Sequence, residues 1–88
     1  MDKYRVSSNL AISENGFLFF PATGDSFTLN EIGSSIVGLL KKDNSKSEII
    51  EIIIEKYDID KHSAERDVTD FITQLISFNL AEELWTLL

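Results

Sequence analysis

The chain has 88 residues, with 15 acidic and 8 basic side chains, a net charge of −7, one histidine and no cysteine. The lack of cysteine excludes disulfide frameworks, thiol chemistry and cysteine-ligated zinc sites. The one histidine, His62, leaves almost nothing for a metal centre or a histidine relay.

The sequence lacks the signals of a membrane or secreted protein. No apolar run approaches the roughly 20 residues of a membrane span, and the N-terminal stretch has no apolar segment typical of a secretory signal. We therefore expect one soluble, cytoplasmic domain over residues 1–88. Its excess of acidic residues repels nucleic-acid phosphates and attracts basic peptides or basic protein surfaces.

The first third of the chain has the period-two pattern of β-strands. It predicts three antiparallel strands over residues 4–12, 16–21 and 25–29, connected as a meander. The Asn15-Gly16 pair between apolar runs is a strong hairpin signal, because both residues tolerate a positive φ. Residues 22–25 provide the second turn.

From Leu29 onward the period changes to that of helices. Helices are predicted over residues 30–41, 46–57 and 61–78, so the fold class is α+β, with a three-stranded antiparallel sheet followed by three helices. The tail, residues 80–88, is either a last short strand or an apolar segment packed on the body.

Capping signals mark the first two helices. Asn30 can cap the first, and Ser45 with Glu48 forms the capping-box pattern at the start of the second. Gly33 and Gly38 each weaken the first helix by about 1 kcal/mol relative to alanine. They would also allow a neighbouring element to approach closely.

The sequence has few residues and motifs that could support catalysis. Asp58, Asp60 and His62 have the alternate spacing that opens an EF-hand loop, but Ser63 occupies the glycine position and Thr69 the position of the bidentate glutamate. We interpret Asp60 as a helix cap. The chain also has no nucleophile elbow and no phosphate-binding glycine loop. We expect no catalytic residue, no cofactor and no metal.

DNA binding is the structural alternative. Three helices with a tight corner before the last resemble a helix-turn-helix whose recognition helix begins at Lys61. Between Lys61 and Phe78, however, there are two basic residues and three acidic ones. Phosphate repulsion therefore argues against this helix as a DNA reader.

The strand over residues 25–29 ends the predicted meander and has no lysine or proline to guard its edge. Such an edge is either covered by another part of the chain or extended by a strand from a partner. The hydrophobic period alone leaves both possibilities open.

An ordered set of short motifs runs from Val6 to about Glu83. Its pieces are Gly24-Asp25-Ser26-Phe27-Thr28-Leu29-Asn30-Glu31-Ile32-Gly33-Ser34-Ser35-Ile36, then Ser45 to Ile53, then Tyr57-Asp58-Ile59-Asp60, and last Glu65-Arg66-Asp67-Val68 with Phe71, Ile72, Leu75 and Leu80. At these spacings the set resembles the family of the pyrroloquinoline quinone synthesis protein D. Asn79 stands where many relatives carry glycine, and asparagine also adopts the left-handed conformation.

The resemblance implies a winged-helix-like domain called a RiPP recognition element, which is not an enzyme. Members bind the leader segment of a ribosomally made precursor peptide. They present the peptide to a modifying enzyme, such as a radical SAM enzyme, a leader peptidase or a cyclase. We therefore expect a monomer or weak dimer with a peptide partner and no nucleic-acid partner. A DNA-binding regulator and an accessory enzyme subunit using Asp58, Asp60 or His62 remain the alternatives.

In the family, the leader adds beside the third strand, and its apolar side chains enter a cleft against the third helix. Carried to this chain, the implied peptide-binding residues are Asp25, Ser26, Phe27, Thr28, Leu29, Arg66, Asp67, Asp70, Phe71 and Gln74. The ladder would use the backbone of Ser26 and Thr28, or of Asp25 and Phe27 in the other register. Asp67 and Asp70 would pair with basic residues of the leader. The ending Trp85–Leu88 lies outside the pattern and either covers a surface, self-associates or docks the enzyme.

Overall fold

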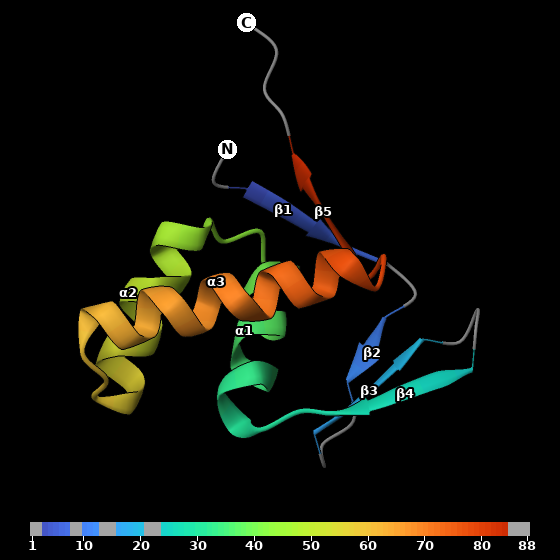
Figure 1. Ribbon diagram of the computed structural model, residues 1–88, viewed down its shortest axis with the longest axis horizontal. Coiled ribbons are helices and arrows are strands. Elements are labelled where there is room, and N and C mark those ends of the chain that lie inside the picture. The colour runs from blue at the N-terminus through green and yellow to red at the C-terminus, as the bar shows by residue number, and fades with distance from the viewer. Residues whose placement is uncertain (1–2, 8–9, 13–15, 21–23, 85–88) are drawn as a thin grey trace, which may run out of the picture.

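The structure is a computed structural model that describes residues 3–7, 10–12, 16–20 and 24–84. Its strands are β1 (Lys3–Val6), β2 (Ala11–Ile12), β3 (Phe17–Phe20), β4 (Asp25–Thr28) and β5 (Ala81–Leu84), and its helices are α1 (Glu31–Lys41), α2 (Lys46–Tyr57) and α3 (Lys61–Ser77). Figure 1 shows α3 crossing α1 and α2, with the β1–β5 ribbon on one side of it and the other three strands beyond its C-terminal end.

The described residues form an α+β fold, with three helices and two small antiparallel sheets. One sheet has the order β2-β3-β4, and the other pairs β1 with β5. The prediction of one continuous strand over residues 4–12 is wrong. The chain turns after β1, where the Leu10 N–H donates to the Ser7 carbonyl, and the Leu10 side chain is buried. This turn lets β1 and β2 join different sheets.

A further strand follows the helices, which is one of the two possibilities left open for the tail. β5 follows α3 and pairs along β1, from Lys3 opposite Leu84 to Val6 opposite Ala81. Of the two possibilities for the tail, the described part, up to residue 84, is a strand. Residues 85–88 lie outside the described residues, as do Asn15 and residues 22 and 23 of the turn expected over residues 22–25.

The helices agree with their predicted ranges to within one residue at each end. The Asn30 side chain accepts the Gly33 N–H at 2.7 Å, and Ser45 with Glu48 forms the reciprocal capping box. Each cap satisfies backbone donors that the first helical turn leaves without an intrahelical acceptor.

The third helix is capped at both ends. The Asp60 side chain accepts the Ser63 N–H at 3.0 Å, which confirms the cap prediction and lowers the pKa of Asp60 below its ordinary value. At the other end Asn79 has a φ of 60°, and the Leu80 N–H donates to the Leu75 carbonyl at 2.8 Å. This is a Schellman ending, in which a left-handed residue turns the chain out of the helix and into β5.

One hydrophobic core joins the helices to both sheets. Its largest fully buried side chains come from β3 and the three helices: Leu18, Ile36, Val37, Ile49, Ile53 and Val68. Tyr4 of β1 and Ala81 of β5 extend the same cluster under the two-stranded ribbon. No helix in the described part of the chain is long and apolar enough to cross a membrane.

The turn before β3 requires a glycine. Gly16 has a φ of 81°, and a Cβ added there would lie 2.9 Å from the carbonyl oxygen of Leu29. The Leu29 N–H in turn donates to the Gly16 carbonyl at 2.7 Å. Gly24 has a similar φ of 76° but would have no atom within 4 Å of its Cβ.

These two glycines allow a matched comparison. We predict that Gly24→Ala lowers the free energy of unfolding by about 1 kcal/mol, the cost of the left-handed backbone for alanine. Gly16→Ala should lower it by roughly 1 kcal/mol more, because its Cβ also clashes with the carbonyl oxygen of Leu29, directly after β4. Urea denaturation of both variants measures the difference, and equal losses would contradict the constraint at Leu29.

Candidate functional site

The edge of β4 has a defined backbone register. β4 pairs with β3 so that Thr28 lies opposite Phe17 and Phe27 opposite Leu18, and the same register places Leu29 opposite Gly16. Since the Leu29 N–H donates to the Gly16 carbonyl directly opposite it, this is a hydrogen-bonded pair. Such pairs alternate along an antiparallel ladder, so Phe27 also bonds to β3.

It follows that Ser26 and Thr28 direct their N–H and C=O groups away from β3. β4 is the terminal strand of its sheet, and both residues are exposed. Among the described residues, no hydrogen bond outside the sheet ladder uses the backbone of Ser26 or Thr28. The edge therefore has donors and acceptors for another strand.

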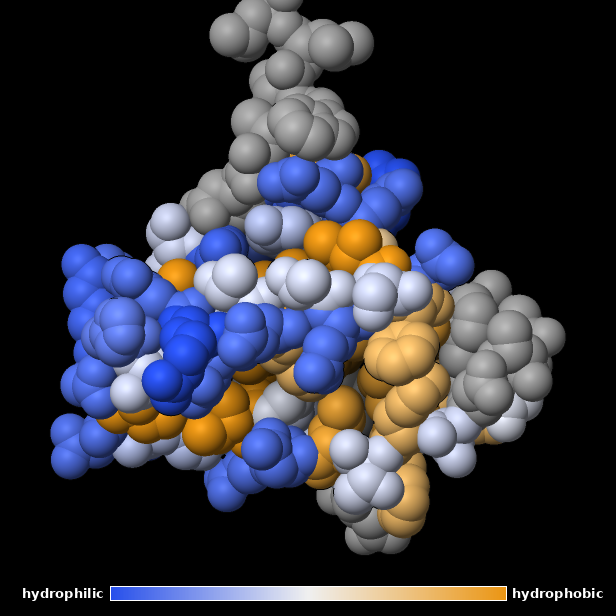
Figure 2. Space-filling model, viewed as in Figure 1, coloured by the Kyte–Doolittle hydropathy of each residue, from blue (hydrophilic) through white to orange (hydrophobic). Residues whose placement is uncertain are grey.

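An apolar hollow of about 140 Å³ lies beside this edge, between β4 and α3. Phe27 of β4 and Phe78 at the end of α3 pack with ring centroids 5.2 Å apart and tilted by 41°. Figure 2 shows hydrophobic surface gathered between the C-terminal half of α3 and the region of β3 and β4. The lining residues are Leu18, Phe27, Thr28, Leu29, Phe71, Gln74, Leu75, Phe78 and Leu80.

Gly33 positions the inner end of this hollow. A Cβ on Gly33 would lie 3.1 Å from Cε1 of Phe71 and 3.6 Å from Cβ of Leu29. The bare glycine therefore lets Phe71 reach the junction of β4 and α1, as expected from the sequence. The same expectation is wrong for Gly38, because a Cβ there would meet no atom within 4 Å.

Charged residues continue the α3 wall of the hollow toward the start of the helix. Asp67 precedes Phe71 by four residues and Asp70 precedes Gln74 by four, so each lies one turn before a lining residue on the same side of the helix. Both aspartates are exposed, and the Arg66 Nε lies 3.5 Å from the Asp67 Oδ1. We refer to the hollow and this adjoining surface of α3 together as the groove, whose apolar end is at Phe78 and whose acidic end is at Asp67.

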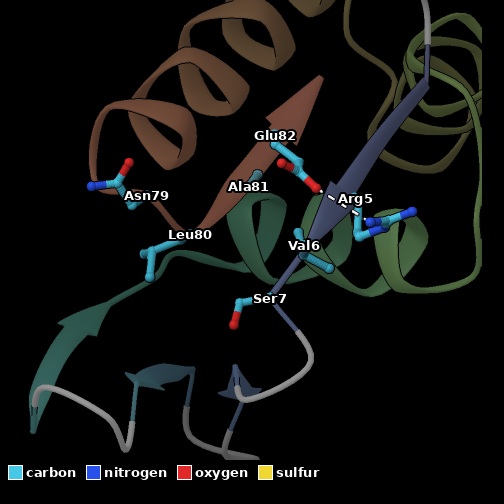
Figure 3. A pocket seen from close by; sticks show the side chains of 7 residues that line it. All are labelled: Arg5, Val6, Ser7, Asn79, Leu80, Ala81 and Glu82. Atoms are coloured by element: carbon cyan, nitrogen blue, oxygen red, sulfur yellow. Dashed lines mark hydrogen bonds and ion pairs between the residues drawn. The ribbon is translucent and has the colours of Figure 1, made fainter. Parts of the chain in front are cut away.

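A larger hollow, of about 590 Å³, lies at the corner between β1 and the α3–β5 turn. Its charged side chains, Arg5 and Glu82, point toward each other across the two strands and form an exposed ion pair at 3.3 Å (Figure 3). Because this pair neutralises itself, the hollow has no net charge to select a ligand. The smaller hollow is the better candidate for a binding site, since it combines aromatic side chains with an open strand edge.

The family model described as "Coenzyme PQQ synthesis protein D (PqqD)" matches residues 16–81. The chain belongs to the PqqD family. No curated protein matches it in sequence.

Two solved structures are similar to this PqqD-family chain. The first, "TbiB1 in complex with the TbiA(beta) leader peptide", is 29% identical, with a TM-score of 0.79, and the match covers 93% of this chain and 99% of that one. The second, "Lasso peptide synthetase B1 complexed with the leader peptide", is 21% identical, with a TM-score of 0.79, and the match covers 92% and 99%. At that lower identity the likeness concerns the fold.

The structure brings together half of the residues implied by the resemblance to the family: Phe27, Thr28, Leu29, Phe71 and Gln74 line one hollow. Ser26 lies on the adjoining edge, and Asp67 and Asp70 lie one turn away. Arg66 precedes Asp70 by four residues and lies farther round α3 from the hollow. The Asp25 backbone is in β4, but its side chain lies outside the described part of the chain.

Sequence reasoning missed part of the lining. Phe78 belongs to the wall and is 56% exposed, but it is absent from the peptide-binding residues implied by the family resemblance. The signal was present, because Phe78 follows Gln74 by four residues and therefore continues the same side of α3. Leu18, Leu75 and Leu80 form the floor, and their role was hidden because their pattern is that of ordinary core residues.

Proposed function

We propose that this PqqD-family protein binds the leader segment of a ribosomally made precursor peptide by strand addition at β4 and presents it to a modifying enzyme. The supporting observation is the open edge of β4 beside an apolar hollow closed by α3. The similarity to TbiB1, which was solved with a leader peptide, favours the same reading. We also propose that residues 1–88 form a single winged-helix-like domain.

The backbone register determines which main-chain groups and which side chains would contact the leader. A leader strand antiparallel to β4 would pair with the outward N–H and C=O groups of Ser26 and Thr28, whatever its sequence. The leader residue opposite Phe27 would then direct its side chain to the inner face of the sheet. That side chain would enter the hollow against Phe71 and Phe78, so an apolar residue is required there.

The acidic end of the groove supplies a second requirement. Asp67 and Asp70 lie beyond Phe71, and the chain as a whole carries a net charge of −7. A lysine or arginine of the leader near these carboxylates would gain favourable pairing and faster association. We therefore infer a leader with an apolar residue and at least one basic residue on the side of Leu29.

The protein itself would contribute no chemistry in this account. The enzyme partner would be of a class that the family serves: a radical SAM enzyme, a leader peptidase or a cyclase. The protein would act in the cytoplasm, as a monomer or weak dimer, without nucleic acid, cofactor or metal.

The decisive experiment titrates the protein with a synthetic leader peptide of the precursor encoded beside its gene, and with a scrambled peptide. We predict that Thr28→Pro weakens leader binding roughly five- to tenfold, because it removes an edge N–H worth about 1 kcal/mol. Thr28→Ala keeps the N–H and should stay within about twofold of the wild type. Equal affinity of the scrambled peptide, or equal affinity of the two variants, would contradict strand addition at this edge.

The acidic end of the groove generates a separate prediction. Asp70→Lys should weaken a basic leader by roughly three- to tenfold at low salt, and the loss should shrink as salt is added. Glu51→Lys makes the same charge change on an exposed position of α2. Fluorescence anisotropy at several salt concentrations distinguishes the two, and an equal effect of both variants would show long-range attraction and no pairing with Asp70.

A further inference from the structure

A hollow of about 200 Å³ lies between α1 and α2, and its charged side chains are all basic. Its lining residues are Ser35, Gly38, Leu39, Lys42, Ile52 and Lys56. Gly38 borders open space, because a Cβ there would meet no atom within 4 Å. Lys42 and Lys56 are exposed, in a chain whose net charge is −7. We call this feature the basic hollow.

The two lysines lie at opposite ends of the basic hollow. The Lys56 Nζ donates to the Ser35 Oγ at 3.2 Å and lies 5.4 Å from the centroid of the Tyr57 ring. Ser35 is therefore beside the C-terminal end of α2. From there α1 runs back to the short connection at residues 43–45, so Lys42 lies beside the first half of α2.

The next side of α2 carries a row of like charges. Glu51 and Glu55 are exposed and one turn apart, and each directly precedes a residue of the basic hollow. We call this row the acidic ridge. Like charges at this spacing slightly destabilise a helix, so the row does not serve the stability of α2. Ile52, 36% exposed, lies between the ridge and the lysines.

These charges are not neutralised within the chain. In the part of the chain that the structure describes, no ion pair involves Lys42, Lys56, Glu51 or Glu55. The surface of α1 and α2 therefore presents a basic side and an acidic side, and each is available to a partner of opposite charge.

A second copy of this chain carries the complementary charges. A two-fold axis parallel to α2 would place the α2 helices of two copies side by side, with the acidic ridge of each against the basic hollow of the other. Glu55 would then lie beside Lys56 of the other copy, because adjacent residues differ by only about 1.5 Å along a helix. An antiparallel arrangement would instead set the two acidic ridges against each other.

We propose that this chain self-associates as a two-fold dimer in which the acidic ridge of each copy occupies the basic hollow of the other. Exposed ion pairs contribute little individually, so the dimer is weak and depends on several pairs together. Figure 1 shows α2 near the N-terminal end of α3 and β4 beyond the C-terminal end of α3. Both β4 edges therefore stay open in the dimer.

The test is a charge swap in the intact protein. The first variant, Lys42→Glu with Lys56→Glu, has two acidic sides, and the second, Glu51→Lys with Glu55→Lys, has two basic sides. Each is studied alone and in an equimolar mixture by sedimentation equilibrium. Salt at about 0.15 M limits the mutual repulsion of the copies to about 8 Å. The singly substituted pair, Lys56→Glu and Glu55→Lys, replaces any double variant that does not fold.

The matched control is Lys61→Glu with Arg66→Glu, which makes the same charge change as the first variant at exposed positions of α3. Its dimerisation should stay within about twofold of the wild type, because long-range repulsion is screened.

We expect the wild type to dimerise with a dissociation constant of roughly 10 µM to 1 mM, the range of weak complexes. Each charge variant alone should associate at least about tenfold more weakly, since like charges would face each other. Their mixture should form a heterodimer within about threefold of the wild-type affinity.

A wild type that stays monomeric at about 1 mM would overturn the inference. So would a mixture that stays monomeric, or a wild-type dimer that neither charge variant weakens more than the control. Because the test uses no leader peptide, its result is independent of the proposed function.

Discussion

The hydrogen bond from the Leu29 N–H to the Gly16 carbonyl fixes the geometry on which the site depends. It sets the phase of the β3–β4 ladder, so that Phe27 bonds inward while Ser26 and Thr28 face the open edge. The same phase places the Phe27 side chain toward α3 and the Phe17 and Phe19 side chains toward the outside. A one-residue slip would reverse all of these directions.

α3 converts this edge into a groove. Its buried side packs on the core through Ala64, Val68 and Ile72, while Phe71 and Phe78 stand over β4. Gly33 lets Phe71 approach closely, and the Schellman ending at Asn79 turns the chain so that Leu80 closes the floor. Rigid elements thus hold the apolar contacts, and the backbone edge is left available.

The composition of the chain suits the proposed binding function. With no cysteine and one histidine, the chain has few groups for covalent or acid–base chemistry. A recognition domain needs none of them. The acidic excess, part of which lies on α3 at Asp67 and Asp70, opposes binding to phosphates and suits a peptide with basic residues.

The helices and their caps could be predicted because their signals are local. Asn30, Ser45 and Asp60 each act on backbone groups within three residues. The strands could not be predicted as well, since β1 pairs with β5 across almost the whole chain. No local pattern marks such a partner. The first and last strands were therefore misplaced or left open.

The candidate site also has residues that could be predicted from the sequence and others that could not. The family motif identified Phe27, Leu29, Phe71 and Gln74, which the fold does gather. Phe78 was not identified, because spacing cannot tell a buried position from one at the margin of a groove. The sequence could not decide which backbone groups of β4 face the open edge. That choice depends on a single hydrogen bond between Gly16 and Leu29.

Amide hydrogen exchange of β4 tests the central claim most directly. In the free protein, the amides of Ser26 and Thr28 should exchange rapidly, while those of Phe27 and Leu29 are protected by the ladder. Saturation with the leader peptide should slow exchange at Ser26 and Thr28. If these two amides stayed unprotected while the peptide was bound, or if protection appeared only on the β1–β5 ribbon, strand addition at β4 would be contradicted.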